Sequence, residues 1–316
     1  MTSRKTVELL ESAAAAQLLT DPPTSQWRLT ITRFRGRRSG MIGLGIVIPL
    51  VIIAIFAPVI APSGPNDVLI GKEDVGPQEK PCVHILGCDP EKPQHIMGTD
   101  GNVRDEFSRV IFGARVSLTL GFFTVTIALI VGSTLGAIAG YVGGWFDNIV
   151  MRFMDVILGF PSLLLAIAIV SVLGPGLQNA LIAIAIVSIP AYARVMRSQV
   201  LSIKESDYVS ASKALGQSAF GILIRRVVPN ALTPLVVLAT LGVATAILEA
   251  AGLSFLGLGA QPPTAEWGTM LATERNNVFT SPHLVFFPGF AIMITVLGFN
   301  LMGDGLRDAL DPSLNK

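Results

Sequence analysis

Side chains that commonly carry out chemistry are few in this sequence, and they lie far apart. The histidines His84, His95 and His283 are not spaced with a nucleophile or with further ligands in the pattern of a catalytic or metal site. The chain also lacks the Gly-x-x-x-x-Gly-Lys-Ser/Thr loop that cradles nucleotide phosphates. We therefore predict no catalytic residue, metal ion or cofactor in this chain, and surface positions for the histidines.

The two cysteines could react with each other. Cys82 and Cys88 are separated by five residues and flanked by Pro81 and Pro90, which is not the paired Cys/His spacing of a zinc site. If their segment faces an oxidising exterior, a disulfide can form between them. Because the loop that it closes is small, it should stabilise local structure rather than the whole fold.

The composition of the chain indicates that it lies in a membrane. Hydrophobic residues make up 51% of the chain and charged residues only 14%, against about 25% charged in a soluble domain. The apolar residues fall in long blocks, which indicates one membrane domain. A net charge of +1 gives no reason to expect a nucleic-acid partner.

Six apolar blocks are candidates for transmembrane helices, since about 20 residues of helix cross the hydrocarbon core. They are Gly40–Ala61, Val116–Gly140, Val156–Leu173, Asn179–Ala193, Ala231–Leu248 and Leu284–Met302. The chain divides into a tail (1–39), a first helix (40–61), a loop (62–113), a five-helix core (114–305) and a second tail (306–316). Glu249 follows the apolar part of the fifth block, where we expect a water-facing helix end.

The positions of the basic residues predict the orientation of these helices. Lys and Arg near the ends of a span resist translocation, and Arg33, Arg35, Arg37 and Arg38 directly precede the first block. Both termini and the segment 194–228 are therefore expected in the cytoplasm. The loop 62–113, which has an acidic excess, is expected outside the cell.

The sequence predicts a helical hairpin from Glu205 to Phe220 within the cytoplasmic segment. Ser206 and Ser218 can cap two short helices, and Gly216 suits the left-handed residue between them. The residues that a soluble partner could grip are Asp207, Tyr208, Ser210, Ala211, Ser212, Leu215, Gly216 and Phe220. The alternative is an amphipathic loop that lies at the lipid headgroups.

This segment resembles the cytoplasmic loop of permease subunits in ATP-binding-cassette importers. That loop has the pattern Glu-Ala-Ala, three residues, Gly, and a Pro about a dozen residues later, which Ala211, Gly216 and Pro229 match, whereas Ser210 and Ser212 replace the usual Glu and second Ala. Further segments resemble the second permease of dipeptide and oligopeptide importers. They are Met97–Asp100, Gly113–Leu118, Leu253–Gly259 and Asn300–Pro312.

The resemblance implies an all-α integral membrane protein with six transmembrane helices, in the bundle of a type I ATP-binding-cassette importer permease. It also implies a location in the plasma membrane of a prokaryote, surrounded by membrane lipid. The implied partners are a homologous permease, one or two cytoplasmic ATPase subunits that bind ATP and Mg, and an extracytoplasmic substrate-binding protein. Nickel or another small solute is an alternative substrate, because such importers use similar permeases.

Other readings follow from the residues alone. A stand-alone secondary transporter usually carries charges or broken helices near the midplane, whereas the centres of these blocks are almost free of charge. A membrane enzyme would need a cluster of acid, base and nucleophile, which we do not find. Gly132, Gly136 and Gly140 give the second helix a smooth face, which we expect to pack within this chain rather than at a subunit interface.

Overall fold

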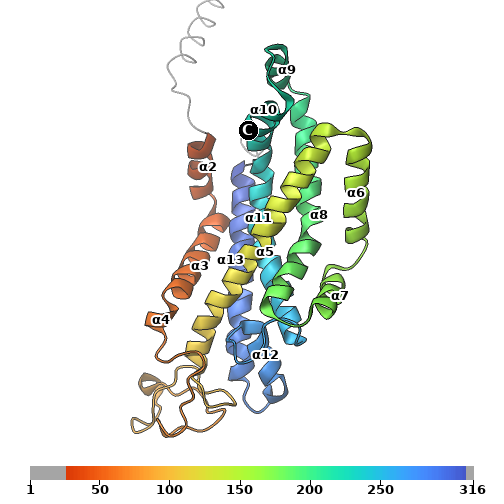
Figure 1. The fold of residues 1–316 in the computed structure, drawn as a ribbon. Helices are drawn as coiled ribbons and strands as arrows, with labels where there is room; N and C mark the ends of the chain where they lie inside the picture. Colours follow the sequence, from red (N-terminus) through yellow and green to blue (C-terminus); the bar gives the residue numbers. More distant parts are fainter. Residues whose placement is uncertain (1–25, 311–316) are drawn as a thin grey trace, which may run out of the picture.

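The computed structural model describes residues 26–310, which form a bundle of helices joined by loops (Figure 1). Within these residues β-structure is limited to isolated bridges. Residues 1–25 of the expected amino-terminal tail and 311–316 of the expected carboxyl-terminal tail lie outside the described part. The helices are α2 (Gln26–Arg35), α3 (Arg38–Ile55), α4 (Ala57–Ile60), η1 (His84–Leu86), α5 (Glu106–Val142), α6 (Gly144–Leu158), α7 (Ser162–Leu173), α8 (Leu177–Lys204), α9 (Asp207–Ala214), α10 (Ala219–Ile222), η2 (Leu223–Val227), α11 (Val228–Phe255), α12 (Trp267–Glu274), η3 (Arg275–Asn277) and α13 (His283–Leu310).

Five helical segments in this part of the chain are long and apolar enough to cross a membrane: α3, α5, α8, the continuous run 219–255 and α13. The pair α6 and α7 passes the same test jointly but is bent by 93°. The structure thus accounts for six crossings if this bent pair counts as one. The expected all-α, six-span architecture is confirmed.

Two of the expected spans are interrupted by proline. The third was expected as one helix over Val156–Leu173, but it breaks between Leu158 and Ser162. Pro161 has no N–H for the helix ladder and disfavours helical geometry at the residue before it. The first span, expected over 40–61, likewise stops at Phe56 and resumes as α4, whose second residue is Pro58.

The other spans extend beyond their apolar blocks. α5 begins at Glu106, so residues 106–113 of the expected loop are helical, and the Asp105 side chain caps this start by accepting a 2.7 Å hydrogen bond from the Ser108 N–H. α8 extends to Lys204, and α13 continues to Leu310, within the expected tail 306–316. Hydropathy locates the part of a helix that lies in lipid, whereas caps decide where the helix ends.

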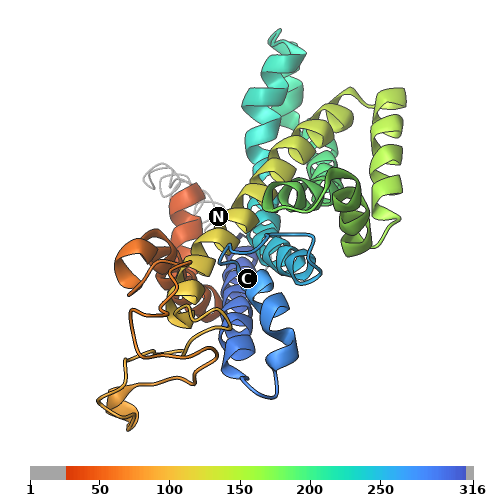
Figure 2. The same ribbon diagram turned by 60° about the horizontal axis from the view of Figure 1, so that its bottom comes forward.

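The helical bundle has two ends, which we name by the segments that lie there. The hairpin end holds α2, α9, α10 and the end of α13, and the loop end holds the segment 62–105 and α12 (Figure 1). In Figure 2 the loop 62–105 projects to one side of the bundle at the loop end. Both ends of the described chain therefore lie on the same side as the hairpin, as the pattern of basic residues predicts.

The seam between α5 and α8 depends on the three glycines of α5. A Cβ atom on Gly132 would lie 2.7 Å from the Ile189 carbonyl oxygen, and one on Gly140 would lie 3.0 Å from the Arg197 carbonyl oxygen. A Cβ on Gly136 would overlap the backbone of Ala193, which is fully buried. The glycines thus let two backbones meet within this chain, as expected.

Candidate functional site

The hairpin end carries the candidate site, a protrusion formed by α9, the turn at Gly216 and α10 (Figure 1). Gly216 has a φ of +77°, and nothing lies within 4 Å of the position that a Cβ atom would take. The Ser218 hydroxyl accepts a 3.2 Å hydrogen bond from the Gly221 N–H and so caps α10. The expected hairpin with a left-handed glycine is therefore present.

Ser206 differs from its expected role. It is the residue directly before α9, at the N-cap position, but its side chain does not cap that helix. The Ser206 hydroxyl instead donates to the Ile203 carbonyl oxygen at 2.6 Å. Its side chain thus continues the hydrogen bonding of α8 into the turn. The start of α9 is left to Asp207, whose negative charge in the first turn suits the positive end of the helix dipole.

The hairpin is seated on the bundle by its inner face. Val209 is fully buried in the main hydrophobic core together with Ile222 and Val227. Ser212 is also buried and donates to the Tyr208 carbonyl oxygen at 2.8 Å. The inner face of α9 therefore packs in the same core as the residues that lead into α11.

The other residues singled out from the sequence lie on the outer face. Leu215, at the end of α9, is 83% exposed, and Phe220 of α10, which borders a groove beside α5, is 74% exposed. The remaining exposed candidates are Asp207, Tyr208, Ser210, Ala211 and Gly216. This exposed surface presents small residues, two apolar side chains and polar groups to a partner. Ser212, in contrast, belongs to the buried face that packs on the bundle.

A π-helical turn, η2, connects the hairpin to the fifth span. Pro229, the second residue of α11, cannot donate the helical hydrogen bond to the Arg225 carbonyl oxygen. The Asn230 side chain donates to the neighbouring Arg226 carbonyl oxygen at 2.6 Å and to the Tyr208 hydroxyl at 3.3 Å. The sequence contained a signal for this feature, the proline, but did not reveal the widened turn.

Two ion pairs near the hairpin end were also missed. Arg197 of α8 donates to Asp147 of α6 at 2.6 Å, and Arg194 donates to Asp155 at 2.8 Å. Both join helices that are far apart in the sequence, so spacing could not reveal them. They hold α6 against α8 before the chain bends at Pro161.

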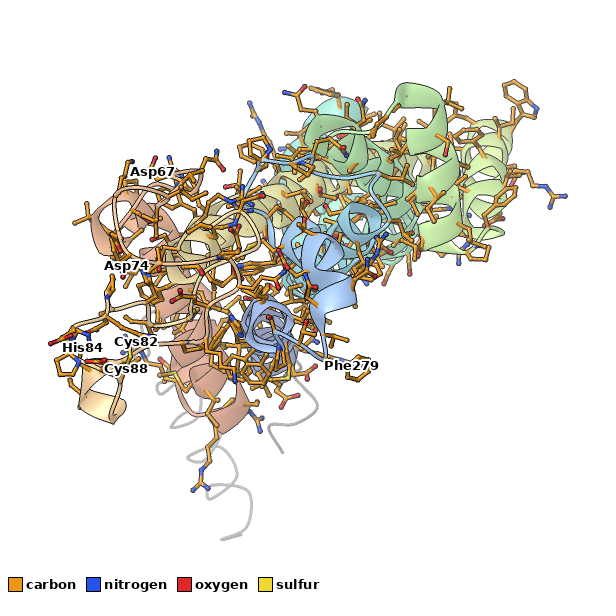
Figure 3. The ribbon with its side chains drawn as sticks, turned by 90° about the horizontal axis from the view of Figure 1, so that it is seen from below. Asp67, Asp74, Cys82, His84, Cys88 and Phe279 are labelled. Carbon is orange, nitrogen blue, oxygen red and sulfur yellow. A yellow bond between two sulfur atoms is a disulfide. The ribbon has the colours of Figure 1, made fainter. Side chains whose placement is uncertain are left out.

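At the loop end the structure joins Cys82 and Cys88 by a disulfide, which confirms the expected bond. Figure 3 shows both cysteines with His84 at one edge of this end. The His84 Nε2 atom lies 2.8 Å from the Lys92 carbonyl oxygen, and Ile85 within the closed loop is 95% exposed. The disulfide and this hydrogen bond support a small projecting loop.

This disulfide gives a test of the loop's location. We expect an impermeant maleimide to label Cys82 and Cys88 in intact cells only after an impermeant reductant has been added, because the loop is predicted to face outside and the thiols are paired. The measurement is the mass shift of the purified chain. Labelling without reductant would contradict the disulfide, and labelling only after permeabilisation would contradict the orientation.

The prediction of surface histidines is wrong for His95 and His283, which are both buried. His95 lies between two carboxylates, with Nδ1 2.9 Å from Asp105 Oδ1 and Nε2 3.0 Å from Glu73 Oε2. The hydrogen bond to Asp105 raises the pKa of His95, and burial opposes it only in part. Burial would raise the pKa of Asp105, but its bonds to His95 and Ser108 lower it below the ordinary value.

These shifts predict a pH window for the order of the loop. The His95 pair contributes fully below the unfolded histidine pKa of about 6.5 and is lost as pH rises through the higher folded pKa. The Asp105 contribution is present above about 3.9 and is lost as pH falls through the lowered folded pKa. We therefore expect loop amides to exchange at least about tenfold faster at alkaline pH, since a charged hydrogen bond contributes about 1.5–3 kcal/mol.

Hydrogen exchange measured by mass spectrometry, corrected for the intrinsic effect of pH, checks this expectation. A His95→Asn chain serves as the control, and it should lack the alkaline change. Equal corrected exchange at pH 6 and pH 9 in the unmodified chain would show that the pair does not order the loop.

Glu249 does not end its helix, contrary to expectation. α11 continues to Phe255, and Glu249 is half-buried. Among residues 26–310 no group of three or more His, Cys, Asp or Glu side chains is placed to hold a metal ion.

Comparisons with known proteins agree with this arrangement. Residues 132–316 match the family described as binding-protein-dependent transport system inner membrane component. Residues 25–79 match the N-terminal TM domain of oligopeptide transport permease C. The two matched regions include the first span, the glycine seam and the hairpin.

Similar proteins span nearly the whole chain. The dipeptide transport system permease protein DppC of Alkalihalophilus pseudofirmus is 48% identical over 92% of this chain and 91% of its own length. The glutathione transport system permease protein GsiD of Escherichia coli O6:K15:H31 is 44% identical over 93% of each chain.

A solved structure supports the fold. An inward-facing form of the MetNI methionine ABC transporter has a chain that aligns with a TM-score of 0.54 and 18% identity, over 64% of this chain and 96% of that one. The expected similarity to an importer permease bundle is therefore confirmed. With the family match over residues 132–316 and these relatives, the chain belongs to the inner-membrane components of binding-protein-dependent transport systems.

Proposed function

We propose that this chain forms one half of the translocation pathway of an ATP-driven importer for short peptides. The relatives carry the substrate part of this proposal, because the compounds in the names of DppC and GsiD, dipeptides and glutathione, are both short peptides. A second, similar permease completes the pathway. The binding protein delivers peptide at the loop end, outside the cell.

The observation that supports energy coupling is the exposed face of the α9 hairpin. It projects beyond the bundle, while its inner face is buried against residues that lead into α11. A partner that grips Leu215 and Phe220 can therefore move the fifth span. One or two ATPase subunits supply that grip and hold ATP and Mg.

The proposed location is the plasma membrane of a prokaryote, with both termini and the hairpin in the cytoplasm. The basic residues before α3 support this orientation, since such residues resist translocation. Lys204 at the end of α8, whose Nζ lies 3.2 Å from the Gly140 carbonyl oxygen, adds positive charge at the hairpin end.

Reconstitution tests the proposal. The chain, its partner permease and the ATPases are placed in proteoliposomes, and uptake of a labelled dipeptide is measured with the binding protein outside the vesicles. We expect uptake that requires both the binding protein and ATP supplied to the ATPases. Uptake of nickel without peptide would overturn the substrate assignment, and uptake driven by an ion gradient without ATP would overturn the importer mechanism.

A further inference from the structure

A groove near the loop end lies between α3 and α5 and is closed on one side by Phe299 of α13. Its volume is about 480 Å³, and its lining is mainly apolar, with Val51 and Ile55 from α3 and Leu118 and Phe122 from α5. We call it the α3–α5 groove. It opens to the outside of the chain, so its contents must come from the bilayer or from another subunit.

The walls of the α3–α5 groove present large apolar side chains to the surroundings. Ile55 is 63% exposed, Phe122 is 61% exposed and Phe123 is 52% exposed. Such surface is stable against hydrocarbon but not against water. Apolar atoms, from the bilayer or from another subunit, must therefore cover the walls of the groove.

One charged residue, Arg115, lines the α3–α5 groove. Its side chain is exposed and forms no ion pair within residues 26–310. Thr119 lies one turn deeper along α5 and also lines the groove. A guanidinium and a hydroxyl at one end of an apolar groove suit a ligand with an anionic head and an apolar tail.

The position of Arg115 along α5 places it at the depth of the lipid headgroups. It directly precedes the uncharged run Val116–Gly140, whose 25 residues make about 37 Å of helix. At the far end of that run, Lys204 reaches the Gly140 carbonyl oxygen and marks the opposite polar boundary. Because α5 runs obliquely through the bundle (Figure 1), this length spans a hydrocarbon core of about 30 Å with Arg115 at its edge.

We propose that the α3–α5 groove binds one anionic phospholipid from the leaflet at the loop end. The phosphate contacts the Arg115 guanidinium and the Thr119 hydroxyl, and an acyl chain runs inward past Ile55, Val51 and Phe122. Arg115 and Phe122 are seven residues apart, or about 10 Å along α5, which is most of the roughly 15 Å depth of one hydrocarbon leaflet. The bound lipid would fill the space between the first span and the core and fix their spacing.

Charge favours a lipid over the second permease as the occupant. A protein surface in the groove would have to offer a carboxylate to Arg115 at the membrane border, whereas every anionic phospholipid brings a phosphate to that depth. The phosphate and the acyl chain are also joined in one molecule, in the order that the groove requires.

Lipid retention tests this proposal. The full transporter is purified in mild detergent, and the phosphatidylglycerol that stays bound is counted by native mass spectrometry. We expect one tightly held phosphatidylglycerol, lowered about fivefold in occupancy by Arg115→Gln, since one such contact contributes about 1 kcal/mol. Arg115→Lys should retain most of it. Thr119→Trp, which fills the groove while keeping the charge, should displace it.

The matched control is Arg152→Gln on α6, because Arg152 is likewise exposed and without an ion pair in the described part of the chain. It should leave the count unchanged. Equal retention by Arg115→Gln and the unmodified chain, or equal loss in Arg152→Gln, would overturn the proposal. So would efficient cross-linking of Thr119→Cys to the second permease, because the groove would then hold protein.

Discussion

Replacement of Gly216 by Val is expected to lower ATP-dependent transport at least tenfold while the chain still inserts into the membrane. The φ of +77° at Gly216 costs an ordinary residue about 1–2 kcal/mol, and a β-branched one more. The open space around this position excludes a steric clash with neighbouring atoms as the cause. The strain should therefore change the angle between α9 and α10 and misplace the exposed face.

Gly216→Asn is the matched control, because Asn tolerates the left-handed region far better than Val does. Uptake of labelled dipeptide and the ATPase activity stimulated by the loaded binding protein should both recover substantially in this variant. Full uptake by a stably inserted Gly216→Val chain would refute the role of the hairpin and favour an interfacial loop.

Replacement of Gly136 by Val should have an even larger effect than Gly216→Val. It should disrupt the packing and assembly of the chain rather than its coupling to the ATPases. The new side chain would meet the Ala193 backbone, which cannot rotate away as a side chain can. Overpacking costs about 1–3 kcal/mol where neighbours can shift, and we expect the top of this range or more here. The chain should lose its monodisperse profile in detergent and accumulate poorly.

Gly45→Val provides the control for this prediction. Gly45 also lies in a spanning helix, but it is exposed, and nothing lies within 4 Å of its added Cβ atom. The melting temperature of the Gly45→Val chain in detergent should stay near that of the unmodified chain. Comparable stability of Gly136→Val and Gly45→Val would show that the α5–α8 seam does not depend on close backbone contact.

The membrane architecture could be predicted because the bilayer imposes a simple rule on sequence. Each crossing needs a long apolar run, and all six runs correspond to helices or to a bent pair in the structure. The helix ends could not be predicted as well. α5 starts ten residues before the predicted Val116, because Asp105 caps it in a polar setting that hydropathy does not register.

The candidate site was predictable where its signals are local. Gly216 and Ser218 act on neighbouring residues, so their types and spacing suffice. The buried pairing of His95 with Asp105 and Glu73 requires residues up to 32 positions apart in a loop without regular structure. Spacing offers no guide to such contacts, and this is why buried histidines were mistaken for surface ones.

The most direct test of the central claim is a cross-link between the hairpin and an ATPase subunit. Both natural cysteines are held in a disulfide at the loop end, so a single cysteine at the exposed Ser210 can carry a short thiol-directed photo-cross-linker. We expect a specific product with the ATPase in the assembled transporter, altered in yield by ATP. A cysteine at Ser210 that reacts only with lipid, or gives no ATPase product while transport is intact, would contradict it.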